Sequence, residues 1–146
     1  MSISGNTTPP GDTVTSTFAA LFAGLYVAHH LGDYWVQTNT QATTKTLPGR
    51  VGRRACLAHV TTYTITAVLV LTVVAWRLDL VLDPGRAAIG LGVSAVTHYL
   101  ADRRVLLRRL AVLAHHDGPW LDTGGLALMD QSWHIAWLFA AALIMT

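Results

Sequence analysis

The sequence predicts an all-α fold, an integral membrane four-helix bundle, and three observations lead to this class. Hydrophobic residues make up 52% of the chain and charged residues only 12%, about half of the ~25% that soluble domains usually carry. All the acidic residues are Asp, although Glu is common on exposed helices. Four apolar runs, separated by short polar segments, are the candidate membrane spans.

The first run covers residues 18–31 and lies in a stretch without formal charge between Asp12 and Asp33. The residues before it are rich in Ser, Thr, Gly and Pro and contain no Lys or Arg, so we expect no cleavable signal peptide. The sequence therefore predicts a disordered tail over residues 1–16 and a single transmembrane domain over residues 17–146.

The second run, residues 55–76, has no Asp, Lys or Arg and is long enough, at ~1.5 Å per residue, to cross a ~30 Å hydrocarbon core. The third run, residues 87–101, is shorter and follows Pro84 and Gly85. Its helical pattern continues past Asp102, so we expect an amphipathic extension that leaves the bilayer. That pattern comprises Leu106, Leu107, Leu110 and Leu113.

The fourth run, residues 123–146, contains one charged residue, Asp130. Most basic residues lie between the first and second runs or between the third and fourth. These are Lys45, Arg50, Arg53, Arg54, Arg103, Arg104, Arg108 and Arg109. The positive-inside rule then places both segments in the cytoplasm and both termini outside, in a multi-pass protein of the bacterial cytoplasmic membrane.

Three of the four predicted helices carry a His and an Asp four residues apart. The pairs are His29 with Asp33, His98 with Asp102, and Asp130 with His134. This spacing places both side chains on one helix face. Ionisable groups in spanning helices cost ~2.5 to 3.5 kcal/mol each on insertion scales, so they indicate a function. The second helix adds His59 near its start, and all seven residues fall toward the cytoplasmic ends of their helices.

These seven residues are the predicted metal ligands, because nitrogen and oxygen donors without sulfur fit a divalent ion. We expect one or two ions, with Zn as the first choice and Mn or Fe as alternatives. Asp33, Asp102 and Asp130 are the candidates for a general base. Two simpler interpretations stay open: each pair is a buried ion pair, and His59 is a hydrogen-bonding residue between helices.

Other polar residues receive weaker assignments. His30 points about 100° away from His29 on a helix and is placed outside the site. The segment His115-His116-Asp117-Gly118 is interpreted as a solvated turn. Gln37 and Gln131 are candidates for contacts with substrate or with the ligands. No Gly-x-Ser-x-Gly motif is present and Cys56 has no activating context, so metal catalysis is the route that the sequence favours.

These motifs resemble a family of small bacterial integral membrane proteins catalogued only as a domain of unknown function. Its members show Ala-His-x-x-Gly-Asp-x-x-x-Gln in the first helix, a His at the head of the second, Ser-His-x-x-x-Asp in the third and Asp-Gln-x-x-His in the last. Here the corresponding segments are residues 28–37, His59, residues 97–102 with Thr97 in place of Ser, and residues 130–134.

The resemblance covers residues 18–145 and selects His29 over His30. The spacing of these His and Asp motifs is also similar to that in a bacterial group described as membrane-bound metal-dependent hydrolases. The resemblance implies the ligand motif rather than an activity.

The sequence favours a membrane-embedded metal-dependent hydrolase acting on a lipid or amphiphilic substrate. The metal would lower the pKa of a bound water toward ~7 and polarise a phosphoryl or ester oxygen. The alternative is a non-catalytic accessory or structural protein whose metal clamps the helix bundle. Translocation of metal ions or protons ranks third, because the outer halves of the helices lack ionisable residues.

Membrane lipids are the expected partners. Nucleic acid is not expected, because the basic residues form short clusters between apolar runs and no nucleic-acid motif is present. Assembly into a homo-oligomer or a larger membrane complex stays open.

Overall fold

The computed structural model describes residues 10–116 and 118–146, and this part of the chain is all-helical, as predicted. The four long helices are α1 (Pro10–Leu31), α3 (Gly49–Arg77), α4 (Pro84–Asp102) and α6 (Leu126–Met145). The short ones are α2 (Asn39–Thr44) and α5 (Val105–Leu113), and the π-helical turns are η1 (Gly32–Val36) and η2 (Leu121–Gly125). Of the predicted tail, residues 1–9 lie outside the described residues, while residues 10–16 belong to α1.

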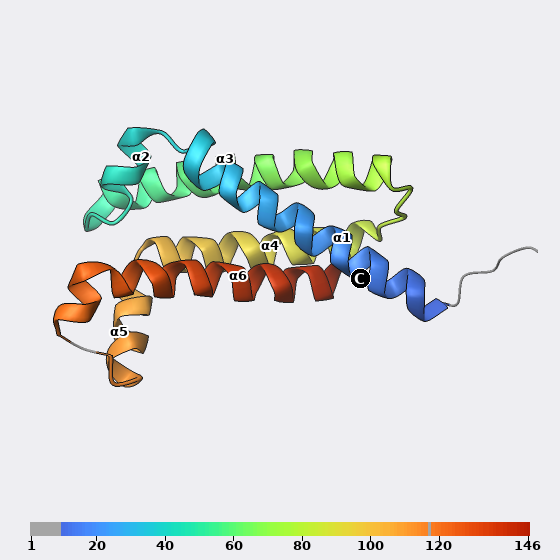
Figure 1. Ribbon diagram of the computed structural model, residues 1–146. Coiled ribbons are helices and arrows are strands. Elements are labelled where there is room, and N and C mark those ends of the chain that lie inside the picture. Colours follow the sequence, from blue (N-terminus) through green and yellow to red (C-terminus); the bar gives the residue numbers. More distant parts are fainter. Residues whose placement is uncertain (1–9, 117) are drawn as a thin grey trace, which may run out of the picture.

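The four long helices pack side by side in a ring. α1 contacts α3 and α6, and α4 contacts the same two helices. The N-terminal end of α1 and the C-terminal end of α6 lie at one end of the molecule, and α2 and α5 lie at the other (Figure 1). The C-terminal ends of α1 and α4 and the N-terminal ends of α3 and α6 therefore converge at the end that carries α2 and α5.

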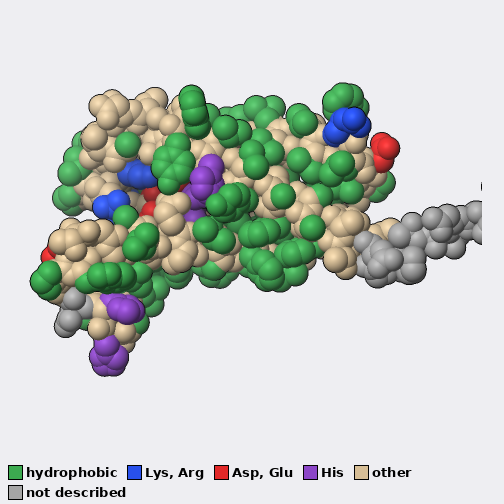
Figure 2. Space-filling view, in the orientation of Figure 1, with side chains coloured by type: hydrophobic (Ala, Val, Ile, Leu, Met, Phe, Trp, Pro, Cys, Tyr) green, Lys and Arg blue, Asp and Glu red, His purple; other side chains and the backbone are tan. Residues whose placement is uncertain are grey.

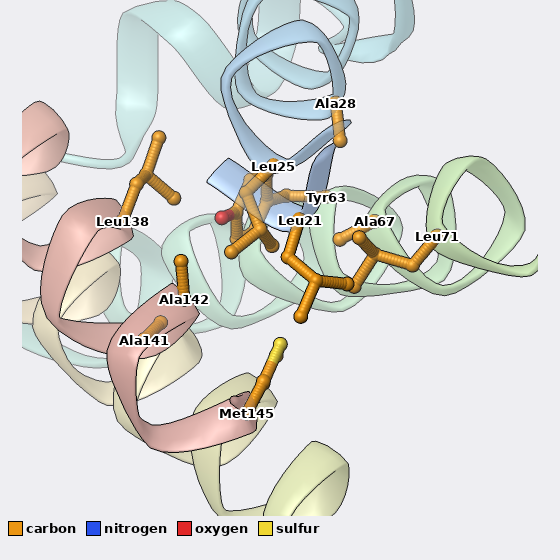
Figure 3. Packing of buried hydrophobic residues seen from close by; sticks show 10 residues of the cluster. All are labelled: Leu21, Leu25, Ala28, Tyr63, Ala67, Leu71, Leu138, Ala141, Ala142 and Met145. Carbon is orange, nitrogen blue, oxygen red and sulfur yellow. The ribbon is translucent and has the colours of Figure 1, made fainter. Parts of the chain in front are cut away.

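An apolar core fills the part of the ring nearer the termini (Figure 3). It comprises Leu21, Leu25, Ala28, Tyr63, Ala67, Leu71, Leu138, Ala141, Ala142 and Met145, from α1, α3 and α6. The α1 members recur at helical spacing, which places them on one face. Gly90 of α4 lets that helix approach α6, since a Cβ there would lie 2.6 Å from Met145 Cγ.

Local capping fixes where two of the helices begin. Asp83 precedes α4, and its Oδ1 accepts the N–H of Arg86 at 2.8 Å, with Pro84 at the first helical position. Thr38 and Gln41 form a capping box at the start of α2: each side chain accepts the other residue's backbone N–H. α2 was not expected from the sequence.

The expectation of a continuous extension of the third helix requires correction. α4 ends at Asp102, Arg104 adopts a left-handed backbone with φ 56°, and α5 then runs crosswise to α4 and α6 (Figure 1). This turn buries Leu107 and Ala111 in a second apolar cluster with Leu121 and Leu126. The prediction of an amphipathic helix after Asp102 was correct, but no Gly or Pro in the sequence marks the break between α4 and α5.

Two helices of the described chain are long and apolar enough to cross a membrane: Thr13–Val36, which includes η1, and Gly49–Arg77. α4 carries polar residues near its C-terminal end and α6 carries them near its N-terminal end, and these residues lower the mean hydropathy of both helices. These include His98 and Asp102 in α4 and Asp130, Gln131 and His134 in α6. The helices therefore suggest membrane association, and four spans stay a prediction.

Candidate metal centre

The histidines and aspartates that the sequence singles out lie together at the end where the long helices converge. We call them the His/Asp cluster, and its members are His29, Asp33, His59, His98, Asp102, Asp130 and His134. Each has a side-chain contact with another member. His29, His59, His98, Asp102 and His134 are at most 3% exposed. The structure thus brings all seven residues together, from α1, η1, α3, α4 and α6.

Helix geometry explains how α1 and η1 contribute two members. His29 lies in the last turn of α1 and Asp33 in the π-helical turn, with His29 Nδ1 3.7 Å from Asp33 Oδ2. Gly32 lies between them and packs closely on α3, where a Cβ would be 3.0 Å from the Tyr63 ring. A larger residue at position 32 would therefore push Asp33 away from α3.

The centre of the cluster has the spacing of a metal site. Asp33 Oδ1 lies 3.4 Å from Nε2 of His59 and 3.4 Å from Nε2 of His98, and these two nitrogens are 3.0 Å apart. Asp102 Oδ2 lies 3.3 and 3.4 Å from the same two nitrogens. Donor atoms bound at ~2.1 Å to one tetrahedral ion are separated by about 3.4 Å. The four oxygen–nitrogen distances in the two triangles that share the His59–His98 edge match this separation, and the edge itself, at 3.0 Å, is shorter.

Two more groups of ligand atoms adjoin the centre. One comprises His29, His98 and His134, and the other Asp102, Asp130 and His134, with the donor atoms of each group within 4.8 Å of one another. The His98 and His134 ring centroids are 4.2 Å apart. Because the groups share residues, the cluster has donors for one central ion and for a second ion beside it.

Unpartnered buried atoms indicate that the donor set fits a metal. Six side-chain atoms of the cluster are buried without a hydrogen-bond partner among the described residues. They are His29 Nδ1, Asp33 Oδ1, His59 Nδ1, Asp102 Oδ2, Asp130 Oδ1 and His134 Nε2. An unsatisfied buried polar group costs roughly 1–3 kcal/mol. A divalent cation at the centre would satisfy Asp33 Oδ1 and Asp102 Oδ2, whereas His59 faces the centre through Nε2 and its Nδ1 stays outside that donor set.

Lys45 contacts the His/Asp cluster, and the sequence did not predict this contact. Its Nζ lies 2.7 Å from Asp102 Oδ1, and its side chain is only 13% exposed. The Arg103 guanidinium donates to the backbone oxygens of Lys45 and of Leu47, the latter at 2.9 Å, and so ties the segment between α2 and α3 to the end of α4. The sequence assigned Lys45 and Arg103 to membrane topology, and nothing in their local pattern signals these contacts.

Neighbouring side chains hold the imidazoles in place. The Tyr63 ring stacks on His98 with centroids 4.1 Å apart, and its hydroxyl forms a 2.6 Å hydrogen bond with Ser94 Oγ. His29 Nε2 donates to Gln131 Oε1 at 3.4 Å. Gln131 thus contacts a predicted ligand, and it follows Asp130 directly in the Asp-Gln motif.

Residues placed outside the site do lie outside the cluster. His30 Nδ1 donates to the Tyr26 backbone oxygen at 3.0 Å. His115 and His116 are exposed after α5, and Asp117 lies outside the described residues. The Cys56 thiol is buried and its Sγ lies 3.8 Å from the Tyr99 backbone oxygen.

One face of the molecule carries a small patch of charged and histidine side chains. Figure 2 shows acidic, basic and histidine atoms next to one another near the end that carries α2 and α5. Apolar side chains surround this patch on the same face. This patch lies at the end of the molecule that also holds the His/Asp cluster.

Comparison with known proteins supports the resemblance drawn from the motifs. No curated protein matches the chain, and no solved structure does. The model of a family described as "Protein of unknown function (DUF3307)" matches residues 21–146, a segment that contains every member of the His/Asp cluster. The chain belongs to the DUF3307 family.

Proposed function

We propose that the protein is a membrane-embedded, metal-dependent hydrolase that acts on a lipid or amphiphilic substrate. The observation that carries the proposal is the central pair of triangles, in which Asp33 and Asp102 each lie 3.3 to 3.4 Å from the same two imidazole nitrogens. Zn is the first choice of ion for such a nitrogen and oxygen donor set, and Mn or Fe(II) also fits.

Exposed apolar side chains on all four long helices support placement in a membrane. They include Val27, Leu31, Ile65, Leu69, Ile89, Val96, Leu128 and Leu143. A water-facing surface rarely carries so many, whereas lipid tails accommodate them. Most basic residues lie at the cluster end, while Arg77 and Arg86 lie at the other. The positive-inside rule then favours four spans, a cluster near the cytoplasmic leaflet and both termini outside.

The proposed chemistry divides the carboxylates into two roles. A bound divalent ion supplies Lewis-acid activation of water and of a phosphoryl or ester oxygen. Asp33 and Asp102 each contact two imidazoles of the centre, so they serve as ligands. Asp130 contacts only His134 within the cluster, at 3.7 Å, and its side chain is 13% exposed against 2% for Asp102. Asp130 is therefore the residue that we assign to proton transfer from the attacking water.

A structural role is the second candidate, and one observation favours it. The three groups of donor atoms together draw side chains from all four long helices and share His98 and His134, so bound metal would link the helices of the ring. In this case the metal stabilises the fold and no substrate reacts. Both candidate functions require a bound metal, and only the hydrolase converts a substrate.

The test combines metal analysis with two assays on the purified chain, prepared in detergent without chelator or metal-affinity tag. One assay follows phosphate release from phosphatidic acid, and the other follows acyl release from a fluorogenic ester lipid. We expect stoichiometric metal and turnover in one assay, abolished by EDTA and by Asp130→Asn, which should keep its metal. Metal without turnover in either assay supports the structural role. Absence of stoichiometric metal contradicts both candidates.

A further inference from the structure

The short helix α5 has an exposed face that the cluster does not use. Leu107 and Ala111 on its inner side are buried against η2 and α6. Its other side, which we call the α5 outer face, consists of Val105, Arg108, Arg109, Val112 and Leu113, and these residues line a shallow groove. The three apolar members are 56%, 56% and 75% exposed, in chain order. The face therefore combines exposed apolar side chains with two guanidinium groups.

The direction of α5 relative to the long helices indicates where the α5 outer face would lie in a membrane. α5 runs crosswise to the long helices at the end of the molecule that holds the cluster (Figure 1). If the long helices cross a bilayer, as in the proposed function on which this step rests, a crosswise helix at their end lies along the membrane surface. Helices in that position insert apolar side chains at the acyl boundary and direct basic groups to the headgroups.

The positive charge of the α5 outer face indicates an anionic ligand. Arg109 is exposed and has no ion pair among the described residues, whereas Arg108 forms a 2.7 Å pair with Asp122 in which both side chains are more than half exposed. Such an exposed pair contributes only about 0 to 1 kcal/mol, so Arg108 can exchange its partner at small cost. Two adjacent guanidinium groups on an apolar face complement phosphate anions.

The size of the face argues against a protein partner. Stable protein interfaces bury about 1,200 to 2,000 Å², and a helix of nine residues with four exposed apolar side chains offers far less. We propose that the α5 outer face binds the headgroups of anionic phospholipids in the cytoplasmic leaflet and fixes the cluster at that depth.

Site-directed fluorescence quenching tests this proposal on the full chain. In a Cys56→Ser background, Val112→Cys is labelled with bimane and the protein is placed in nanodiscs of phosphatidylcholine, with or without phosphatidylglycerol. A nitroxide lipid near the headgroup serves as quencher. We expect quenching at position 112 that increases about twofold or more with phosphatidylglycerol. Ala42→Cys on α2, exposed at the same end, is the control and should be quenched little.

Arginine variants test the headgroup contact. Arg108→Gln with Arg109→Gln should remove the effect of phosphatidylglycerol, while Arg50→Gln with Arg54→Gln, in the first turns of α3, should retain it. Equal quenching in both lipids would overturn anionic recognition. Protection of position 112 that depends on protein concentration would instead indicate a second copy and would also overturn the proposal.

A third labelling site separates this proposal from membrane placement. Leu69→Cys lies within α3, where the native side chain is 62% exposed, and is probed with a nitroxide deep in the acyl chain. Quenching at position 69 without quenching at position 112 overturns the role of α5 and leaves the spanning helices intact. Quenching at neither position contradicts the membrane placement itself.

Discussion

His98 is a central residue of the cluster, because its Nε2 contacts Asp33, His59 and Asp102 and it belongs to two of the three donor groups. We expect His98→Ala to remove most of the bound metal. His30→Ala should leave the metal nearly intact, since that imidazole is directed to a backbone oxygen of its own helix. Elemental analysis of the two purified variants measures the difference. Equal metal content would contradict the ligand assignment.

Lys45 provides a second test at a single residue, because its ammonium lies 2.7 Å from the buried Asp102 carboxylate. Lys45→Met should destabilise the metal-free protein by about 3 kcal/mol, since it leaves a buried charge without its partner. Bound metal should offset part of this loss by supplying positive charge to Asp102.

Thermal unfolding in detergent, with zinc or with EDTA, measures both effects of Lys45→Met. Lys45→Arg retains a positive donor and is the matched control. If the loss is the same with zinc and with EDTA, Asp102 does not gain a cation when metal is present, and its role as a ligand fails.

Among the structural elements, the start of α3 depends on Gly52. A Cβ there would lie 1.8 Å from the Leu47 backbone oxygen and 2.7 Å from Arg103 Nη1. Gly52→Ala should therefore displace the segment that carries Lys45 and cost roughly 1–3 kcal/mol. Gly92→Ala is the control, because no atom lies within 4 Å of its Cβ position and Ala favours a helix by about 0.5–1 kcal/mol. Urea or thermal unfolding of both variants compares them, and destabilisation of similar size in both would contradict the close contact.

The long helices and the three His/Asp pairs were predictable because both depend on local geometry. Residues four apart share a helix face whatever the helix packs against, so His98 and Asp102 could be paired from the sequence. The contact of Lys45 with Asp102 was not predictable, since it depends on the path of the segment between α2 and α3. The break at Arg104 was missed for a related reason: packing of α5, and no local residue preference, selects the left-handed turn.

For the whole molecule, the antiparallel ring predicts which exposed positions face the same side of a membrane. Val81, between α3 and α4, lies at the end that holds the termini and is 98% exposed. Val81→Cys should react with an impermeant maleimide added to intact cells, in a Cys56→Ser background. Ala42→Cys, at the cluster end, should react only after the membrane is permeabilised. The reverse pattern would contradict the orientation, and labelling of both in intact cells would contradict the membrane placement.

The distribution of the cluster over four helices also bears on how the chain is made. Synthesis proceeds from the N-terminus, so Asp33 and His59 emerge well before Asp130 and His134. Under the proposed membrane placement, the earlier members hold ionisable groups that lack part of their surroundings until α6 is made, and this state is costly inside a bilayer. A chain arrested before α6 should therefore be recognised and degraded by membrane proteases. Pulse-chase labelling of a chain truncated before α6 measures this, and a truncated chain as long-lived as the full chain would contradict it.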